Sequence, residues 1–394
     1  SAKLRFMSGG IHSKEPTATK RHVLFAILDW GMGHATRTWP LIVAARKSGI
    51  EVTVASRGAA AAWLQDKMHE LQAEERLTGA GPGTPWECLE KPGTNIRYAK
   101  GNLTLLQIAL QMPSFLKSIA QERRWLRTLL AQADITHVVS DNCYGVHPAQ
   151  RSIPSALITH QVVPPTPRVL RPIATLRVRK WATAFDEVWI PDTGKCELAG
   201  ALSDPPMANH RFVGPLSRFA LEDASRPANA AAADLVSPPL VGMVSGPEPQ
   251  RQLMEEALVS CFSRDGRTAL VFSGSPHGTE RRVGNVRILP HAQDRQIRHA
   301  LLHADCIVCR SGYTSLMDLA TLQISAVLVP TPGQPEQEYL ARHWEERWGW
   351  TSVQQDQLAA FQPRQLEPHP VPLPVPAGGK WSWFEDWLRQ APRP

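Results

Sequence analysis

The stretch ILDWGMGHATRTWP (27–40) contains the change from strand to helix on which the predicted fold rests. It continues an apolar run, HVLFAIL (22–28), that has the length of a buried strand. Gly31 and Gly33 then make a tight turn, and a helical pattern with a terminal glycine follows over 36–49. The stretch therefore predicts a strand, a glycine-rich turn and a helix.

Strands and helices alternate in the same way along the rest of the chain. In the first half we predict strands at 22–28, 51–56, 135–142, 155–161 and 187–192, with helices at 36–49, 59–71 and 103–133. In the second half we predict strands at 240–246, 269–274, 286–291, 306–312 and 326–333. Such alternation predicts parallel βαβ units. The expected fold class is α/β, with two Rossmann-like, doubly wound domains that face each other across a cleft.

The 394 residues are enough for two domains, and composition suggests where they divide. A segment rich in Ala, Pro and Ser interrupts the apolar runs and reads as a linker. We expect a flexible N-terminal segment at 1–21, a first domain at 22–215, a linker at 216–239, a second domain at 240–362, and a Pro-rich tail with a terminal helix at 363–394.

Charge and cysteine content exclude several classes of protein. The formal net charge of +7 is modest and no nucleic-acid-binding signature is present. The six cysteines are scattered, and the CxxC at 306–309 lies within an apolar run, so packed thiols are favoured over a zinc site or disulfides. No secretory signal or membrane span is visible, and we expect a cytoplasmic protein.

His34 follows the glycine-rich turn at the start of a helix. The turn is not a dinucleotide fingerprint, because Thr36 stands where GxGxxG needs its third glycine, and the chain has no GxxxxGK[ST] loop. The helix dipole favours a neutral imidazole, which can accept a proton from a hydroxyl or a water. A histidine that merely caps the helix is an equal alternative. Asp29 and Asp141, which also follow strands, are reserve candidates as base or as the partner that orients His34.

The stretch CRSGYTSLMDLATL (309–322) predicts an anion site at a helix start. Ser311, Gly312 and Thr314 leave N–H groups open to a diphosphate, and Arg310 is the cation best placed to help. Asp318, further along the helix, can reach a ribose whose phosphate sits at the helix start, although an ordinary solvated acid is the alternative. The chain has no Asp-x-Asp pair, so no dedicated metal clamp and no cofactor is expected.

Two further loops follow predicted strands of the second half. PTPGQPEQEYL (330–340) carries amide and carboxylate groups that suit sugar hydroxyls: Gln334, Glu336 and Gln337. SGPEPQ (245–250) carries Gly246 and Glu248 and is a weaker signal. A plain surface loop is the alternative for both.

These segments together resemble GT-B-fold glycosyltransferases, the class that includes the bacterial GlcNAc transferase of lipid II synthesis. The resemblance covers roughly 22–350 and rests on GMGH, SDNCYG, THQ, VWIPD, SGPEPQ and, most specifically, on the segment from CRSG to PTPGQPEQ. It implies a nucleotide-sugar donor, usually UDP-linked, on the second domain, with Asp318 at the ribose, Glu336 and Gln337 at the donor sugar, and His34 as base.

The first domain would then bind an unknown acceptor, and the residues expected on that side are Gly31, Gly33, Arg37, Asn142, Tyr144, His160 and Gln161. The motif GxGHxxR also resembles the UDP-sugar hydrolase of pseudaminic acid synthesis, in which a water attacks. A hydrolase and a non-catalytic nucleotide-sugar binder therefore remain alternatives to a transferase. The basic and apolar segment 167–181 suggests an anionic acceptor or a peripheral contact with the inner membrane face, against the alternative of a solvated helix.

Overall fold

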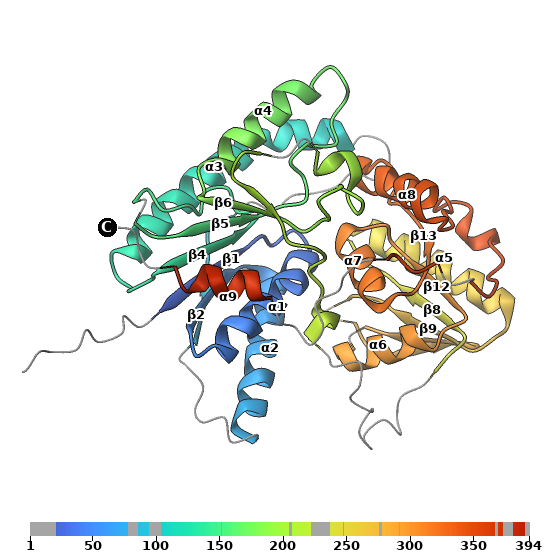
Figure 1. The fold of residues 1–394 in the computed structure, drawn as a ribbon. Helices are drawn as coiled ribbons and strands as arrows, with labels where there is room; N and C mark the ends of the chain where they lie inside the picture. Colours follow the sequence, from blue (N-terminus) through green and yellow to red (C-terminus); the bar gives the residue numbers. More distant parts are fainter. Residues whose placement is uncertain are drawn as a thin grey trace, which may run out of the picture.

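The structure is a computed structural model of the chain. It describes residues 21–77, 86–93, 104–150, 152–204, 207–221, 237–246, 248–275, 278–290, 292–366, 369–372 and 381–390, with Leu77 and 104–111 as backbone only. The described residues form two α/β domains side by side (Figure 1). This arrangement confirms the predicted fold class.

The first domain is built on a seven-stranded parallel sheet in the order β3-β2-β1-β4-β5-β6-β7. Its strands are β1 (His22–Ile27), β2 (Glu51–Ser56), β3 (Trp86–Glu90), β4 (His137–Asp141), β5 (Ser155–Ile158), β6 (Glu187–Ile190) and β7 (His210–Phe212). The central strands are buried along almost their whole length because helices cover both faces of a parallel sheet.

Successive residues of β1 separate the two faces of this sheet. Val23 and Phe25 pack with α1 (Gly33–Lys47) and α2 (Gly58–Leu77) on one face. Leu24 and Ala26 pack on the other face, which α3 (Thr104–Leu130) covers together with α4 (Arg171–Ala182). This alternation is the period of two that a strand imposes.

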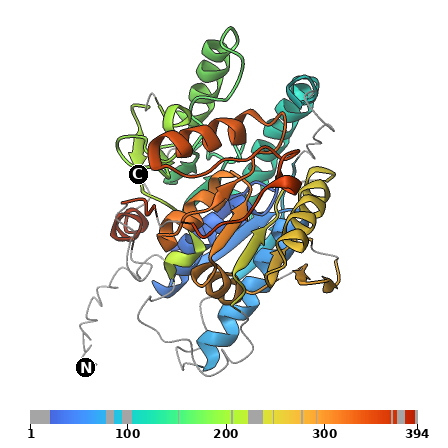
Figure 2. The ribbon, with the colours of Figure 1, turned by 90° about the vertical axis from the view of Figure 1, so that its right-hand side faces the viewer.

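The second domain holds a six-stranded sheet in the order β10-β11-β9-β8-β12-β13. The strands are β8 (Leu240–Met243), β9 (Ala269–Phe272), β10 (Arg281–Val283), β11 (Val286–Leu289), β12 (Cys306–Cys309) and β13 (Val327–Leu328), and only β10 pairs antiparallel. One face packs on α5 (Gln250–Asp265). The other packs on α6 (Asp294–Leu302), α7 (Tyr313–Leu322) and α8 (Pro335–Trp348), as Figure 2 shows from the side of this domain.

The C-terminal helix α9 (Ser382–Leu388) lies on the first domain, beside α1 (Figure 1). Phe384 and Trp387 pack edge-on against Trp189 of β6, with ring centroids 5.8 and 4.9 Å apart. The strand β1 and the helix α9 therefore share one hydrophobic core, although the second domain comes between them in the sequence.

Strand order places one switch point in each sheet. In the first sheet β1 lies between β2 and β4, and in the second β8 lies between β9 and β12. The connections that follow β1 and β8 leave toward one side of these strands, and those that follow β4 and β12 toward the other. Ligands of open α/β sheets bind at such points, outside the carboxyl ends of the strands.

The structure differs from the prediction at several boundaries. The first helix begins at Gly33 rather than at residue 36. The edge strands β3, β7 and β10 were not predicted, since each is only three to five residues long and carries exposed or half-buried positions instead of an apolar run. Two short 3-10 helices, η1 (Gly200–Leu202) and η4 (Leu358–Ala360), were not predicted either.

The first residues of the segment that we expected to be a linker are folded and packed. A 3-10 helix, η2 (Arg218–Leu221), occupies its first residues, and Phe219 is buried in the core of the second domain. The rest of that linker up to 236, the segment 1–20, and the tail over 373–380 lie outside the described residues. No helix in the described part of the chain is long and apolar enough to cross a membrane.

We predict that Phe384→Ala destabilises the first domain by about 3–5 kcal/mol, the usual cost of deleting a buried phenylalanine ring. Urea unfolding followed by circular dichroism measures this free energy. The control is Asp386→Ala, an exposed position on the same helix, which should change stability by about 0.5 kcal/mol or less. A cost for Phe384→Ala no greater than that of the control would contradict the docking of α9.

Candidate functional site

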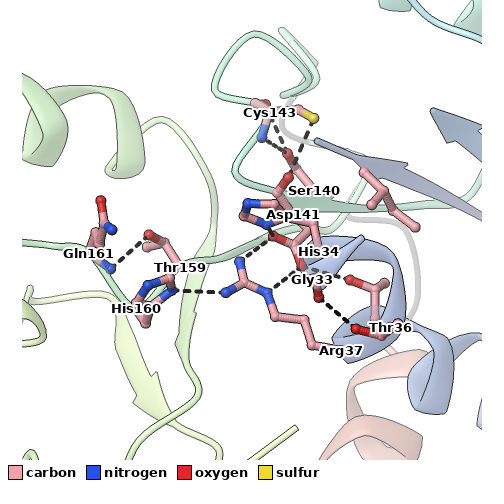
Figure 3. Close-up of polar contacts among 12 residues, drawn as sticks. Gly33, His34, Thr36, Arg37, Ser140, Asp141, Cys143, Thr159, His160 and Gln161 are labelled. Atoms are coloured by element: carbon pink, nitrogen blue, oxygen red, sulfur yellow. Dashed lines mark hydrogen bonds and ion pairs between the residues drawn. The ribbon is translucent and has the colours of Figure 1, made fainter. Parts of the chain in front are cut away.

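His34 and Asp141 meet at the switch point of the first sheet (Figure 3). Asp141 is the last residue of β4 and is paired in register with Ile27 at the end of β1, after which the glycine-rich turn leads to His34. The Nδ1 atom of His34 lies 2.7 Å from Oδ1 of Asp141. Gly31 holds the turn with a φ of +91°, which a residue with a side chain rarely adopts.

Two more side chains of α1 bind the same carboxylate. Arg37 donates from Nε to Oδ2 of Asp141 at 2.7 Å, and its Nη2 donates to Oδ1. Thr38 donates from Oγ1 to Oδ2, also at 2.7 Å. His34, Arg37 and Thr38 stand three and four residues apart, so they share one helix face.

These contacts fix the charge of Asp141. Burial by itself would raise the pKa of this carboxyl, but the charges of Arg37 and His34 and their hydrogen bonds hold it well below its usual value. Burial acts to lower the pKa of Arg37, but the charge and hydrogen bonds of Asp141, together with the charges of Tyr313 and Glu336, more than offset this effect and raise it. A carboxylate can only accept, so Nδ1 of neutral His34 carries the proton and Nε2 keeps a free lone pair. The side chain of His34 is 16% exposed.

A second histidine connects this cluster to the other domain. His160, two residues beyond β5, lies 2.8 Å through Nδ1 from Nη1 of Arg37 and 2.8 Å through Nε2 from Oε1 of Glu336 on α8. Its ring stacks on Tyr313 at the start of α7, with centroids 4.0 Å apart and planes 10° from parallel. Gln161 donates from Nε2 to the second oxygen of Glu336.

The first turns of α1 and α7 also meet between the domains. A Cβ atom at Gly33 would lie 2.7 Å from Oγ1 of Thr314, so only glycine permits this approach. Neither helix has a side-chain cap or an acidic residue in its first turn. Two positive helix ends therefore converge, which is the arrangement that binds an anion.

The residues expected around the donor occupy this region with different roles. Ser311 donates to the backbone oxygen of Gln337. Gln337 accepts from the backbone and the hydroxyl of Thr331, and Gln334 caps α8. These bonds hold the loop after β13 against the start of α7, where Gly312 is the residue before the helix.

Arg310 does not lie where the sequence led us to expect it. Its side chain is buried behind the sheet edge and donates to the carbonyl of Gln250, to Oε1 of Gln355 and to carbonyls of the loop after β13. Burial lowers its pKa to about 10. The expectation that Arg310 contacts a diphosphate is not supported, since these bonds hold the guanidinium inside the second domain.

Asp318 connects the second domain to the segment that leaves the first. It is buried, and it accepts from Ser217 Oγ at 2.6 Å and from Arg218 Nε at 3.2 Å. Burial raises the pKa of this carboxyl, and the bonds from Arg218 and Ser217 offset only part of that effect. Arg218 also pairs with Asp294, which pairs with Lys67 of the first domain. A contact between Asp318 and a ribose stays a prediction.

Some expected residues make no described contact with this cluster. Asp29 faces Arg57, at 3.9 Å, and makes no described contact with His34. Gly246 has a φ of +102°, and Glu248 is exposed and paired with Arg251 of α5.

On the first domain, two of the expected residues lie in the loop that follows β4. Asn142 adopts a φ of +54°, and Tyr144 packs on Trp181 with its pKa raised to about 12 by burial.

Two residues of the cluster, Thr38 and Tyr313, and one contact, the bond between His160 and Glu336, were not predicted from the sequence. Thr38 could have been found, because it lies four residues after His34 on the same helix face. Tyr313 and the bond from His160 to Glu336 carry no local signal, as 176 residues separate the two bonded side chains. Within the described ranges, no three His, Cys, Asp or Glu side chains gather in a way that could hold a metal ion.

Comparison with known proteins bears on the fold of the chain. Residues 280–367 match the family model of the glycosyltransferase family 28 C-terminal domain. No curated protein sequence matches the chain.

Several solved structures are similar in fold at low sequence identity. Arabidopsis thaliana UGT89C1 complexed with UDP-L-rhamnose is 15% identical, covering 94% of this chain and 95% of that one, with a TM-score of 0.56. The calicheamicin glycosyltransferase CalG4 is 14% identical, covering 94% and 92%, with a TM-score of 0.54. The spinosyn rhamnosyltransferase SpnG complexed with thymidine diphosphate is 15% identical, covering 86% and 88%, with a TM-score of 0.53. The two-domain fold is the GT-B fold.

We predict that Asp141→Asn destabilises the protein by about 3–5 kcal/mol at pH 7, because it leaves the buried Arg37 without its counter-charge. The folded-state pKa of Asp141 is depressed, so its stabilisation is complete above the unfolded value near 4 and is lost as pH falls below it. The gap between wild type and variant should shrink by about 1 kcal/mol between pH 5 and pH 3. Urea unfolding at several pH values measures it, and a gap that stays constant would refute the assignment.

Proposed function

We propose that the protein is a glycosyltransferase that moves a sugar from a nucleoside diphosphate, UDP by preference, to an acceptor hydroxyl, with His34 as the general base. One observation carries the proposal. The pair of His34 and Asp141 lies at the switch point of the first sheet and faces the start of α7 at the switch point of the second sheet, where the helix has no side-chain cap. The base and a site for an anionic leaving group thus lie on opposite walls of one interface.

The chemistry follows from the protonation that the contacts impose. Nε2 of His34 takes the proton of the acceptor hydroxyl while its oxygen attacks the anomeric carbon. The bond from that carbon to the phosphate oxygen breaks, and the nucleoside diphosphate leaves with the electron pair. Asp141 stabilises the imidazolium that forms, as the carboxylate of a catalytic triad does. Backbone N–H groups at the start of α7 stabilise the phosphate charge.

The choice of donor rests on the likeness of the fold and on the loop after β13. Similar structures hold UDP-L-rhamnose in one case and thymidine diphosphate in another, so both nucleotides should be tried. Gln334, Glu336 and Gln337 would meet the sugar, and Asp318 the ribose. In the structure, Glu336 is bonded to His160 and Gln161, and Thr314 lies against Gly33. These contacts close the interface between the domains, so the donor would enter when the domains move apart.

The helix α4 favours an acceptor at an anionic lipid surface. The segment 167–182 carries five cations, Arg168, Arg171, Arg177, Arg179 and Lys180, and no acid. Val169, Ile173 and Leu176 are 86%, 68% and 70% exposed, which is unusual for large apolar side chains. A helix with both features binds at the interface of an anionic bilayer. The helix follows directly from the loop of His160 and Gln161, so docking there would bring a lipid-linked acceptor toward the cleft.

We predict that His34→Ala lowers kcat for sugar transfer about 1000-fold, the range expected for loss of a general base, and leaves UDP affinity unchanged. Calorimetry with UDP and thymidine diphosphate identifies the nucleotide. Release of product from the matching nucleotide sugar, measured with and without acceptor and in the presence of EDTA, then gives the rate. The matched control is His303→Ala, an exposed histidine of the second domain.

The outcomes of this experiment separate the candidate functions. Sugar release that needs no acceptor would assign a hydrolase. Nucleotide binding without turnover would indicate a binder, and full turnover by His34→Ala would refute the proposed base.

We predict that the double change of Arg171 and Arg177 to Gln weakens binding to phosphatidylglycerol vesicles about 10- to 30-fold, since each cation near the surface contributes about 1 kcal/mol. Co-sedimentation measures binding, and salt should weaken it. Arg295 and Arg342, exposed on the second domain, changed together to Gln form the matched control. Equal loss in both pairs, or equal binding to neutral phosphatidylcholine vesicles, would contradict a specific lipid contact.

A further inference from the structure

Four side chains form a continuous line from the second domain to the base. Glu336 of α8 bonds His160, His160 bonds Arg37, Arg37 binds Asp141, and Asp141 binds His34. Each joining distance is 2.7 or 2.8 Å. Asp141 and His160 are buried, and the Arg37 side chain that joins them is fully enclosed.

The chemistry of the donors leaves one protonation pattern along this line. Arg37 can only donate, so Nδ1 of His160 must accept. Nε2 of His160 then carries the proton and donates to Glu336. A proton on Nδ1 would face the guanidinium, so His160 stays neutral, and burial agrees with this because it lowers the pKa of the imidazole.

Arg37 is the member that can transmit a displacement. Two of its nitrogens hold Asp141, and the third has His160 as its described acceptor. The planar guanidinium is rigid, so a shift of His160 would rotate it against the carboxylate and change the angle at which Asp141 holds His34. The stack on Tyr313 and the bond to Glu336 both fix His160 from the second domain.

We propose that His160 is a positioning residue, which aligns the pair of His34 and Asp141 with the second domain when the cleft is closed. It acts through Arg37 on one side and Glu336 on the other, and it does not touch the reacting atoms. The base would then be held in its working geometry only while α8 is in place. The inference rests on the proposed function insofar as His34 is the base, but the alignment itself can be measured without substrate.

The measurement that tests the alignment is hydrogen exchange at Nε–H of Arg37, followed by NMR. This proton is buried and bonded to Asp141 at 2.7 Å, so its signal should be visible and slow to exchange, and Arg37→Lys identifies it by its loss. We expect Glu336→Ala, a change in the other domain that removes the acceptor of His160, to speed the exchange about 10-fold, the effect of losing one ordinary hydrogen bond. Glu346→Ala is the matched control, because it makes the same change at an exposed position on the same helix.

Two changes at His160 separate its bonds. In His160→Asn, the side-chain amide can still accept a hydrogen bond from Arg37, but it no longer reaches Glu336. In His160→Gln, the longer side chain can still donate a hydrogen bond to Glu336, but it no longer accepts one from Arg37. With the nucleotide sugar, each should lower kcat about 10- to 100-fold and change the donor KM less than about threefold, as expected for misplacement of a catalytic group. The pH profile of kcat should also shift, since Asp141, Arg37, His160 and Glu336 surround His34 electrostatically.

The outcomes distinguish this inference from the proposed function. Unchanged exchange at Arg37 in Glu336→Ala, or the lack of a protected Arg37 signal in the wild type, would overturn the alignment whatever the activity. Coupled exchange in a protein that turns over no nucleotide sugar would keep the alignment and refute the transferase.

Discussion

The buried carboxylate of Asp141 is the constraint on which the site depends. It accepts four hydrogen bonds from three side chains of α1 and lies at the end of a fully buried strand. An uncompensated charge at this depth would cost several kcal/mol, so the start of α1 must sit where Arg37 reaches β4. The left-handed turn at Gly31 and the pairing of β1 with β4 make that position possible.

The same contact sets the chemistry of the neighbouring histidine. Because Asp141 remains ionised, it can only accept, so Nδ1 of neutral His34 carries the proton and Nε2 keeps its lone pair. The helix α7 approaches from there with its N–H groups uncapped, and Gly33 allows Thr314 to come close. The two switch points, each an ordinary consequence of strand order, thereby become the opposite walls of one site.

Local patterns were sufficient to predict most strands of both sheets and to single out His34 as a candidate. The alternation of apolar strands and amphipathic helices placed ten of the strands and both domains, and the glycine-rich turn singled out His34. Short edge strands such as β3 escaped prediction because half-exposed residues give no apolar run. Arg310 looked free at a strand end, yet its guanidinium folds back to satisfy backbone carbonyls within its own domain. Asp318 likewise occupies a position on its helix that suits contact with a ribose, but its carboxylate accepts hydrogen bonds from Ser217 and Arg218.

The sequence by itself determined where the ten apolar strands lie, because hydrophobic periodicity and glycine are read over a few residues. Only the tertiary structure decided which polar groups meet. Asp141 and His34 are 107 residues apart, and His160 and Glu336 are 176 apart. Strand order brings the first pair together and the packing of two domains the second. Neither contact can be predicted from the local sequence, since the partner of a buried polar side chain is set by the fold and not by its neighbours in the chain.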